Sequence, residues 1–218
     1  ALGVGVGILS AALGLGGGIL MVPIFITFVG MDPNTAKGTS LFLIIFIAIL
    51  NAWRLNKDLP EKPWRTAGLL GVGSLLGSYT AARITSTLSD QTVLIIFIAL
   101  LAVIAIHTFF LKPREVSEKH LHKRKYLAIG IGFLVGLYAG ATGTGGGALM
   151  IPLVLIAGIS VNARVVGLSM MVMIVTSIAG SIAHLQAEKA FQEPWTVGQV
   201  YLPLALLVLP GVLIGTPL

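Results

Sequence analysis

The chain has 218 residues, of which 56% are hydrophobic and only 10% are charged, and its mean hydropathy is +0.98. It has 14 basic and 8 acidic residues, which gives a formal charge of +6 at pH 7, and it has no cysteine. This composition excludes an ordinary soluble domain, a disulfide framework and a thiolate metal site.

Long uncharged runs define the class of protein. Several of them exceed the roughly 20 residues that a membrane-spanning helix needs. A secretory signal would account for one such run, and a transmembrane β-barrel would show alternation in segments of about ten residues. We therefore predict an all-α polytopic membrane protein. The runs without Asp, Glu, Lys or Arg are residues 1–31, 66–82, 91–111, 126–163, 165–187 and 194–218.

The first predicted element, residues 1–30, is an apolar segment broken by the cluster Gly14-Leu-Gly16-Gly17-Gly18. Each glycine destabilises a helix by roughly 1 kcal/mol relative to alanine. A break within lipid is tolerated only where the backbone is buried in protein or lines a cavity. A polar elbow, Asp32-Pro33-Asn34, follows. Helices are then expected at about 38–54, 64–86 and 91–111.

The next segment, residues 112–125, is strongly basic. An excess of Lys and Arg between spans is typical of a cytoplasmic loop. Nucleic-acid binding is not expected, because only this loop is basic. The segment contains Lys112, Arg114, Lys119, Lys123, Arg124 and Lys125 against Glu115 and Glu118, with His120 and His122 beside them.

The second half repeats the landmarks of the first. The cluster Gly143-Thr-Gly145-Gly146-Gly147 lies 129 positions (143 − 14) after the first cluster. Gly38 and Ser40 correspond to Gly167 and Ser169 in the same way, and Pro63-Trp64 resembles Pro194-Trp195. Duplicated breaks at bilayer depth are typical of transporter sites.

We therefore predict two sequence-related repeats, 1–111 and 126–218, joined by the linker. The second would contain a broken segment at 126–158 and helices at about 165–186 and 196–218. A counterpart of helix 91–111 is missing and there is no starting Met, so we expect a sequence truncated at its ends.

The topology of the repeats has two solutions. If each broken segment crosses the membrane once, the copies are parallel, and if each is re-entrant, the copies are inverted. The loop at 54–65 has a net charge of +2 and its counterpart at 187–195 a net charge of −1, which favours opposite sides and hence inversion.

Small residues recur four positions apart in three segments, which predicts close packing of helix backbones. These are Gly3, Gly7 and Ala11; Gly73, Gly77 and Ala81; and Gly132, Gly136 and Gly140.

The helix that restarts after each break has unpaired N–H groups and a positive dipole end, where anions bind. We predict a small anion cage formed by both breaks and by nearby hydroxyls. For each Ser or Thr the alternative is a local bond to its own helix. The proposed binding residues are Gly16, Gly17, Gly18, Thr39, Ser40, Thr144, Gly145, Gly146, Gly147 and Ser169.

Other polar residues are accessory candidates. Asn34, Asn51 and Asn162 could donate amide N–H groups to the anion. Lys37 and Arg164 could attract anions, the alternative being that they snorkel to the interface. His107 and His184 are candidates for proton coupling, the alternative being that both lie at interfaces.

Several chemistries are disfavoured. No acidic residue lies deep in a span, which argues against a cation or metal transporter. The glycines do not fit a nucleotide-binding loop, since no Lys-Ser/Thr follows them. No paired base and nucleophile is visible within the spans, so we expect no enzyme, no cofactor and no metal.

The duplicated Gly-x-Gly-Gly-Gly-x-x-x-x-Pro, followed by a Gly-x-Ser helix start, resembles the TauE/SafE sulfite exporter family, also called the toluene-sulfonate uptake permease family. The resemblance covers both halves, from Gly14 to Ser40 and from Gly143 to Ser169. It implies transport of sulfur-containing anions across the cytoplasmic membrane of prokaryotes. Leu168 departs from the pattern, because the first copy has Thr39 in its place.

The leading hypothesis is a secondary transporter that exports sulfite or a small organosulfonate by alternating access. It would be a multi-pass protein of the inner membrane, with loop 112–125 in the cytoplasm. The expected partners are the anion and the lipid bilayer, and a homo-oligomer is left open. The first alternative is a passive anion channel, and the second is a membrane-embedded enzyme or assembly subunit.

Overall fold

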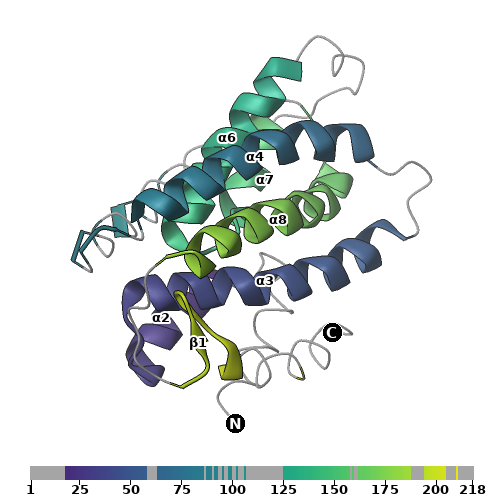
Figure 1. The fold of residues 1–218 in the computed structure, drawn as a ribbon. Helices are drawn as coiled ribbons and strands as arrows, with labels where there is room; N and C mark the ends of the chain where they lie inside the picture. The colour runs from purple at the N-terminus through teal and green to yellow at the C-terminus, as the bar shows by residue number, and fades with distance from the viewer. Residues whose placement is uncertain are drawn as a thin grey trace.

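A computed structural model describes residues 18–57, 63–85, 87–89, 91–92, 125–157, 162–187 and 194–204, with single positions elsewhere. It is almost entirely helical, as expected of an all-α membrane protein (Figure 1). The elements are α2 (Gly18–Val29), α3 (Pro33–Asn56), α4 (Trp64–Thr85), α6 (Lys125–Thr142), α7 (Gly147–Ile156), α8 (Asn162–Leu185), β1 (Thr196–Val197) and β2 (Val200–Tyr201).

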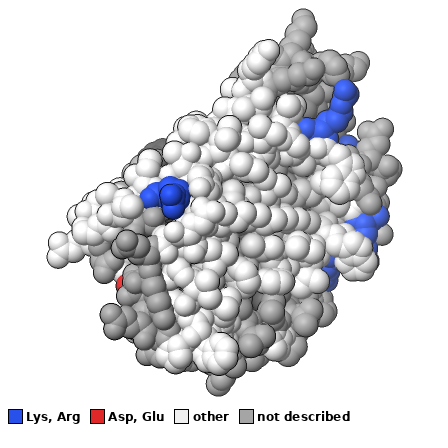
Figure 2. Space-filling model, viewed as in Figure 1, with Lys and Arg blue, Asp and Glu red and all other residues white. Residues whose placement is uncertain are grey.

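Two helices are long and apolar enough to cross a membrane, α3 and the Arg164–Leu185 part of α8, within the described residues. The apolar helices Gly18–Val29 and Tyr126–Thr142 are shorter. Figure 2 shows a broad face without charge, with Lys and Arg at its margins. This distribution suits a protein whose uncharged face contacts lipid.

The helix boundaries differ from the predicted ones at two places. α3 begins before position 38, because Asp32 caps it, accepting a hydrogen bond from the Thr35 N–H (2.9 Å), and Pro33 follows. The helix predicted at 196–218 is replaced at its start by the antiparallel hairpin β1–β2. Positive φ angles at Trp195 (72°) and Gly198 (56°) turn the chain there.

Helix α8 lies between α3 and α4, and α6 packs against α4 (Figure 1). α3 and α8 are antiparallel: a Cβ at Gly38 would lie 2.9 Å from the His184 Cβ. At the other end of the pair, the Asn56 side-chain amide donates to the Gly167 carbonyl (3.1 Å). The start of α3 is therefore level with the end of α8.

The α4–α6 contact is formed by backbone against backbone. A Cβ at Gly132, Gly136 or Gly140 would collide with the carbonyl of Leu70, Ser74 or Ser78, respectively. In the other direction, Gly73 and Gly77 approach the carbonyls of Ile129 and Phe133. The predicted close packing is confirmed for these two helices. Gly3, Gly7 and Ala11 lie outside the described residues.

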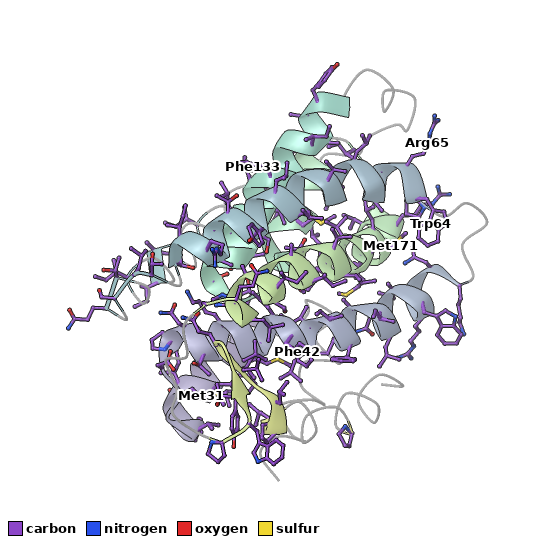
Figure 3. The ribbon with its side chains drawn as sticks, viewed as in Figure 1. Met31, Phe42, Trp64, Arg65, Phe133 and Met171 are labelled. Carbon is purple, nitrogen blue, oxygen red and sulfur yellow. The ribbon has the colours of Figure 1, made fainter. Side chains whose placement is uncertain are left out.

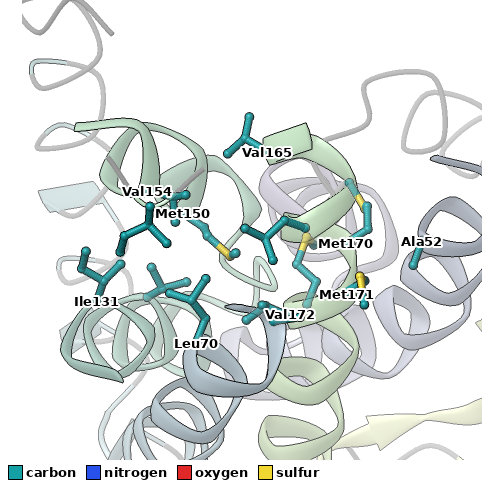
Figure 4. Close-up of a cluster of buried hydrophobic side chains, with 14 of the residues drawn as sticks. Ala52, Leu70, Ile131, Met150, Val154, Val165, Met170, Met171 and Val172 are labelled. Carbon is teal, nitrogen blue, oxygen red and sulfur yellow. The ribbon is translucent and has the colours of Figure 1, made fainter. Parts of the chain in front are cut away.

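Helix α7 folds back along α6. A Cβ at Gly146 would lie 2.7 Å from Cγ1 of Val135, which is about two turns before the end of α6. Figure 4 shows Ile131 of α6 beside Val154 and Met150 of α7, in one buried apolar cluster. The second broken segment is thus folded back on itself as a helical hairpin.

A second apolar cluster joins α2 to α3. Met21, Val22 and Phe25 of α2 pack with Leu43 and Ile47 of α3. This contact fixes the start of α2 relative to the middle of the bundle.

Candidate functional site

The candidate site is the turn between α6 and α7. Gly143, Gly145 and Gly146 have positive φ angles of 75°, 74° and 88°, a conformation that is unfavourable for residues with a Cβ. Gly146 is the N-cap of α7 and provides no side-chain cap. The Met150 N–H bonds to the Gly146 carbonyl (3.0 Å), so the N–H groups before it form the free end of the helix. Such an end favours an anion.

The first glycine cluster meets the second at this turn. Gly18 is the first residue of α2, and a Cβ there would lie 2.5 Å from the Thr144 Cα and 2.8 Å from the Ile44 Cδ1. A Cβ at Gly145 would lie 2.9 Å from Ile44 as well. The starts of α2 and α7 therefore converge. Gly16 and Gly17 lie outside the described residues.

Three hydroxyl groups stabilise the turn itself. Ser40 of α3 donates to the Gly143 carbonyl (2.8 Å). Thr142 donates to the Tyr138 carbonyl (2.7 Å) and lies 2.8 Å from the Thr144 hydroxyl. Because the one Thr142 hydrogen points to a carbonyl, Thr144 is the donor to Thr142. All three hydroxyl hydrogens are thus used within the protein.

Lys37 packs against the turn. Its side chain is 1% exposed, and a Cβ at Gly143 would lie 2.7 Å from the Lys37 Cα. Lys37 is therefore a buried residue that packs against the glycine break. Its side chain does not extend to the surface of the described structure, as the snorkelling alternative required.

The rest of the predicted cage is spread along the bundle. Ser169 is buried and donates to the Met173 sulfur (3.8 Å). Because α3 and α8 are antiparallel, Ser40 and Ser169 are separated along the helix axes by roughly 20 Å at 1.5 Å per residue. The Thr39 hydroxyl accepts a hydrogen bond from the Tyr201 N–H (2.9 Å), so it attaches β2 to α3.

The accessory candidates are also dispersed. Asn34 and Asn51 are buried at positions roughly 25 Å apart along α3. Asn162 is the first residue of α8, and the half-buried Arg164 lies in its first turn, far from Lys37. Asn51 and Arg164 are therefore remote from the α6–α7 turn.

Over residues 1–218 the chain matches the family described as "Sulfite exporter TauE/SafE". The chain belongs to this family. It is 30% identical over 214 residues to a "Probable membrane transporter protein" of Methanocaldococcus jannaschii, covering 93% of this chain and 77% of the relative. It is 28% identical over 212 residues to one of Bacillus subtilis, covering 84% and 76%. No solved structure matches the chain.

The match confirms the resemblance that the glycine motifs indicated. The relatives of this TauE/SafE chain are described as membrane transporters and not as enzymes. Membrane transport is therefore the function class, and the question that remains is what the α6–α7 turn binds.

In this TauE/SafE chain, His184 lies buried at the end of α8. Its Nδ1 is 2.7 Å from Oε1 of Gln199, and it is close enough to Lys37 for their charges to interact. His184 therefore lies within the protein and not at a lipid interface. His107 lies outside the described residues.

Neither Gln199 nor Tyr138 was among the residues predicted from the sequence. Tyr138 is four residues before Thr142 on α6, and residues four apart share a helix face, so its place beside the glycine cluster could have been predicted. Gln199 is brought to His184 by the β1–β2 hairpin, which no residue spacing indicated.

A groove of about 900 Å³ lies between α3, α4 and α8, lined by Trp53, Asn56, Trp64, Gly71, Met171 and Val175 among others. Figure 3 shows Trp64 and Met171 at this end of the bundle. Its apolar lining does not suit an anion, so the α6–α7 turn remains the candidate site.

Proposed function

We propose that the protein is a secondary transporter that exports sulfite or a small organosulfonate by alternating access. The anion would bind at the α6–α7 turn. The observation that supports this most directly is the free start of α7 at Gly147, with the described beginning of α2 and the buried Lys37 packed against the turn before it. The dipole of α7 and the positive charge of Lys37 both favour an anion.

The surroundings of the turn suit an anion better than a cation. Asp32 is the only acidic residue in the described part of the chain, and it caps α3. The same part contains no group of three or more His, Cys, Asp or Glu that could bind a metal. A cation at the turn would meet the positive start of α7 without a carboxylate from the described residues.

An inverted duplication would explain the helix boundaries. α3 and α8 end 129 residues apart (185 − 56), which is the offset between the two glycine clusters. The antiparallel α3 and α8 would cross the bilayer in opposite directions. This arrangement supports the two-repeat proposal, with the linker 112–125 on the cytoplasmic side of the inner membrane.

The centre of the duplication would be apolar. A Cβ at Gly145 would lie 2.8 Å from Met173 and 2.9 Å from Ile44, which are themselves 129 residues apart (173 − 44). Ser40 and Ser169 lie on opposite sides of this pair. We therefore revise the predicted cage: Ser40 lies beside the α6–α7 turn, whereas Ser169 lies beyond Ile44 and Met173 and does not belong to the same anion site.

A membrane potential that is negative inside favours anion exit by about 2.3 kcal/mol per charge per 100 mV. Export therefore needs no coupling ion. If a proton is coupled, His184 is the described candidate, because it is buried beside Lys37. The variant His184→Gln should still transport the anion when flux is measured at a single pH. Its flux should, however, depend less on pH than that of the wild type. An unchanged pH profile would reject this role.

The test of the proposed function is a flux panel in proteoliposomes with sulfite, sulfate, thiosulfate, sulfoacetate and taurine, and with acetate as the carboxylate control. We expect saturable transport and counterflow exchange of sulfite or a sulfonate. Flux without saturation or counterflow would indicate a channel. No binding and no flux with any sulfur anion would reject the proposal.

A further inference from the structure

We propose that the Tyr138 hydroxyl is the side-chain donor that recognises the oxyanion at the start of α7. This inference rests on the proposed function and adds a specificity-determining residue to the same site. It makes Tyr138, together with the backbone N–H groups of α7 and the charge of Lys37, the binding machinery of this site.

The position of Tyr138 supports this role. The side chain is 3% exposed and lies in the last two turns of α6. Its hydroxyl is beside those of Thr142 and Thr144, the residues that flank Gly143. Nevertheless the hydroxyl oxygen is buried without a hydrogen-bond partner in the described part of the chain. A buried hydroxyl without a partner is destabilising, unless a ligand satisfies it.

A count of hydroxyl hydrogens distinguishes Tyr138 from its neighbours. Ser40 donates to the Gly143 carbonyl, Thr142 donates to the Tyr138 backbone carbonyl, and Thr144 donates to the Thr142 hydroxyl, so these hydrogens are not available to a ligand. The Tyr138 hydroxyl is near the Thr142 and Thr144 hydroxyls, but it has no hydrogen-bond partner among the described groups. The turn therefore presents one phenol O–H and the free N–H groups of a ten-residue helix, α7.

This set of donors fits a small anion with at least two acceptor oxygens. One oxygen would accept from the phenol, and another from the start of α7, as charge-assisted hydrogen bonds. The phenol and the N–H groups of α7 would bind only the oxygens of the anion, and neither would contact the organic group of a sulfonate. We therefore expect Tyr138 to recognise the oxyanion centre, in sulfite and in sulfonates alike.

The experiment compares Tyr138→Phe with the wild type and with Tyr126→Phe. Tyr126 is on the same helix but 89% exposed, so it is a matched control. The dissociation constant for sulfite is measured by titration calorimetry in detergent, and KM and kcat are measured in proteoliposomes. We expect Tyr138→Phe to raise Kd and KM about 10-fold or more, as when a hydrogen bond to a charged group is lost. The unfolding temperature without ligand should not fall, and Tyr126→Phe should behave as the wild type.

A second measurement does not depend on the folding of the variant. Wild-type protein made with 3-fluorotyrosine, whose phenol is a stronger donor, should bind sulfite more tightly. Unchanged binding in this protein, or an unchanged Kd in Tyr138→Phe, would overturn the role of Tyr138 while leaving sulfite transport intact. A wild-type protein that binds no anion would instead overturn the proposed function itself.

Discussion

Glycine has two different uses in this molecule, at the α4–α6 contact and at the α6–α7 turn. At the contact, Gly132, Gly136 and Gly140 are ordinary helical residues, and each fits against a carbonyl of α4. At the turn, Gly143, Gly145 and Gly146 have positive φ angles. The glycines of the contact leave no room for a Cβ between the two helices. The glycines of the turn are needed mainly because residues with a Cβ rarely adopt positive φ angles.

The comparison shows how the site is positioned. The contact places α6 rigidly against α4, so the end of α6 is fixed before the chain turns. The turn can then adopt a strained conformation, because α3 and α6 stabilise it through Ser40 and Thr142. A rigid pair of helices thus presents an irregular backbone at a defined place.

The largest expected effect is at the contact. Gly136→Ala would place a Cβ against the Ser74 carbonyl, which cannot move away as a flexible side chain could. We expect a loss of about 1–3 kcal/mol in the free energy of unfolding, measured by thermal or denaturant unfolding in detergent. The control is Gly130→Ala on the same helix, where a Cβ meets nothing within 4 Å. This variant should be about 0.5–1 kcal/mol more stable. Equal effects would contradict the distinction between the two positions.

The next effect separates strain from binding. Gly145 (φ 74°) and Gly30 (φ 73°) have nearly the same backbone conformation, but Gly30 lies in the open turn between α2 and α3. Gly30→Ala should cost about 1–2 kcal/mol of stability. Gly145→Ala should cost at least as much, because its Cβ would also meet Met173 and Ile44. Only Gly145→Ala should also weaken sulfite binding, because it redirects the N–H groups at the start of α7. If Gly30→Ala weakened binding as much, the α6–α7 turn would not be the binding site.

The smallest expected effect concerns Ser40. Ser40→Ala removes the buried hydrogen bond to the Gly143 carbonyl, and should cost about 0.5–1.5 kcal/mol of stability. Sulfite affinity should change less than in Gly145→Ala, since the Ser40 hydrogen is already used. The control is Thr80→Ala, whose exposed hydroxyl donates to Leu76 within its own helix (2.7 Å). A loss of affinity in Ser40→Ala larger than in Gly145→Ala would show that this hydroxyl turns to the anion.

Much of the fold could be predicted from residue patterns. The apolar runs indicated the helices, and the spacing of Gly73, Gly77, Gly132, Gly136 and Gly140 indicated close packing, because a glycine face is needed wherever two backbones meet. The hairpin at 196–201 could not be predicted, since the residues after Pro194-Trp195 are as apolar as those of a helix. Its turn depends on Trp195 and Gly198, whose positive φ angles no hydrophobic period reveals.

The sequence by itself determined the class of protein, the place of the second break and the family, because hydropathy and glycine spacing are local properties of the chain. Tertiary structure decided which polar groups meet. The antiparallel packing of α3 and α8 separated Ser40 from Ser169, and the fold-back of α7 placed its free N–H groups beside Thr144 and Gly18. The use of each hydroxyl hydrogen became defined only in this arrangement, because hydrogen bonds depend on distances between residues that are remote in the chain. Within the described residues, it left the Tyr138 hydroxyl as the donor without an acceptor.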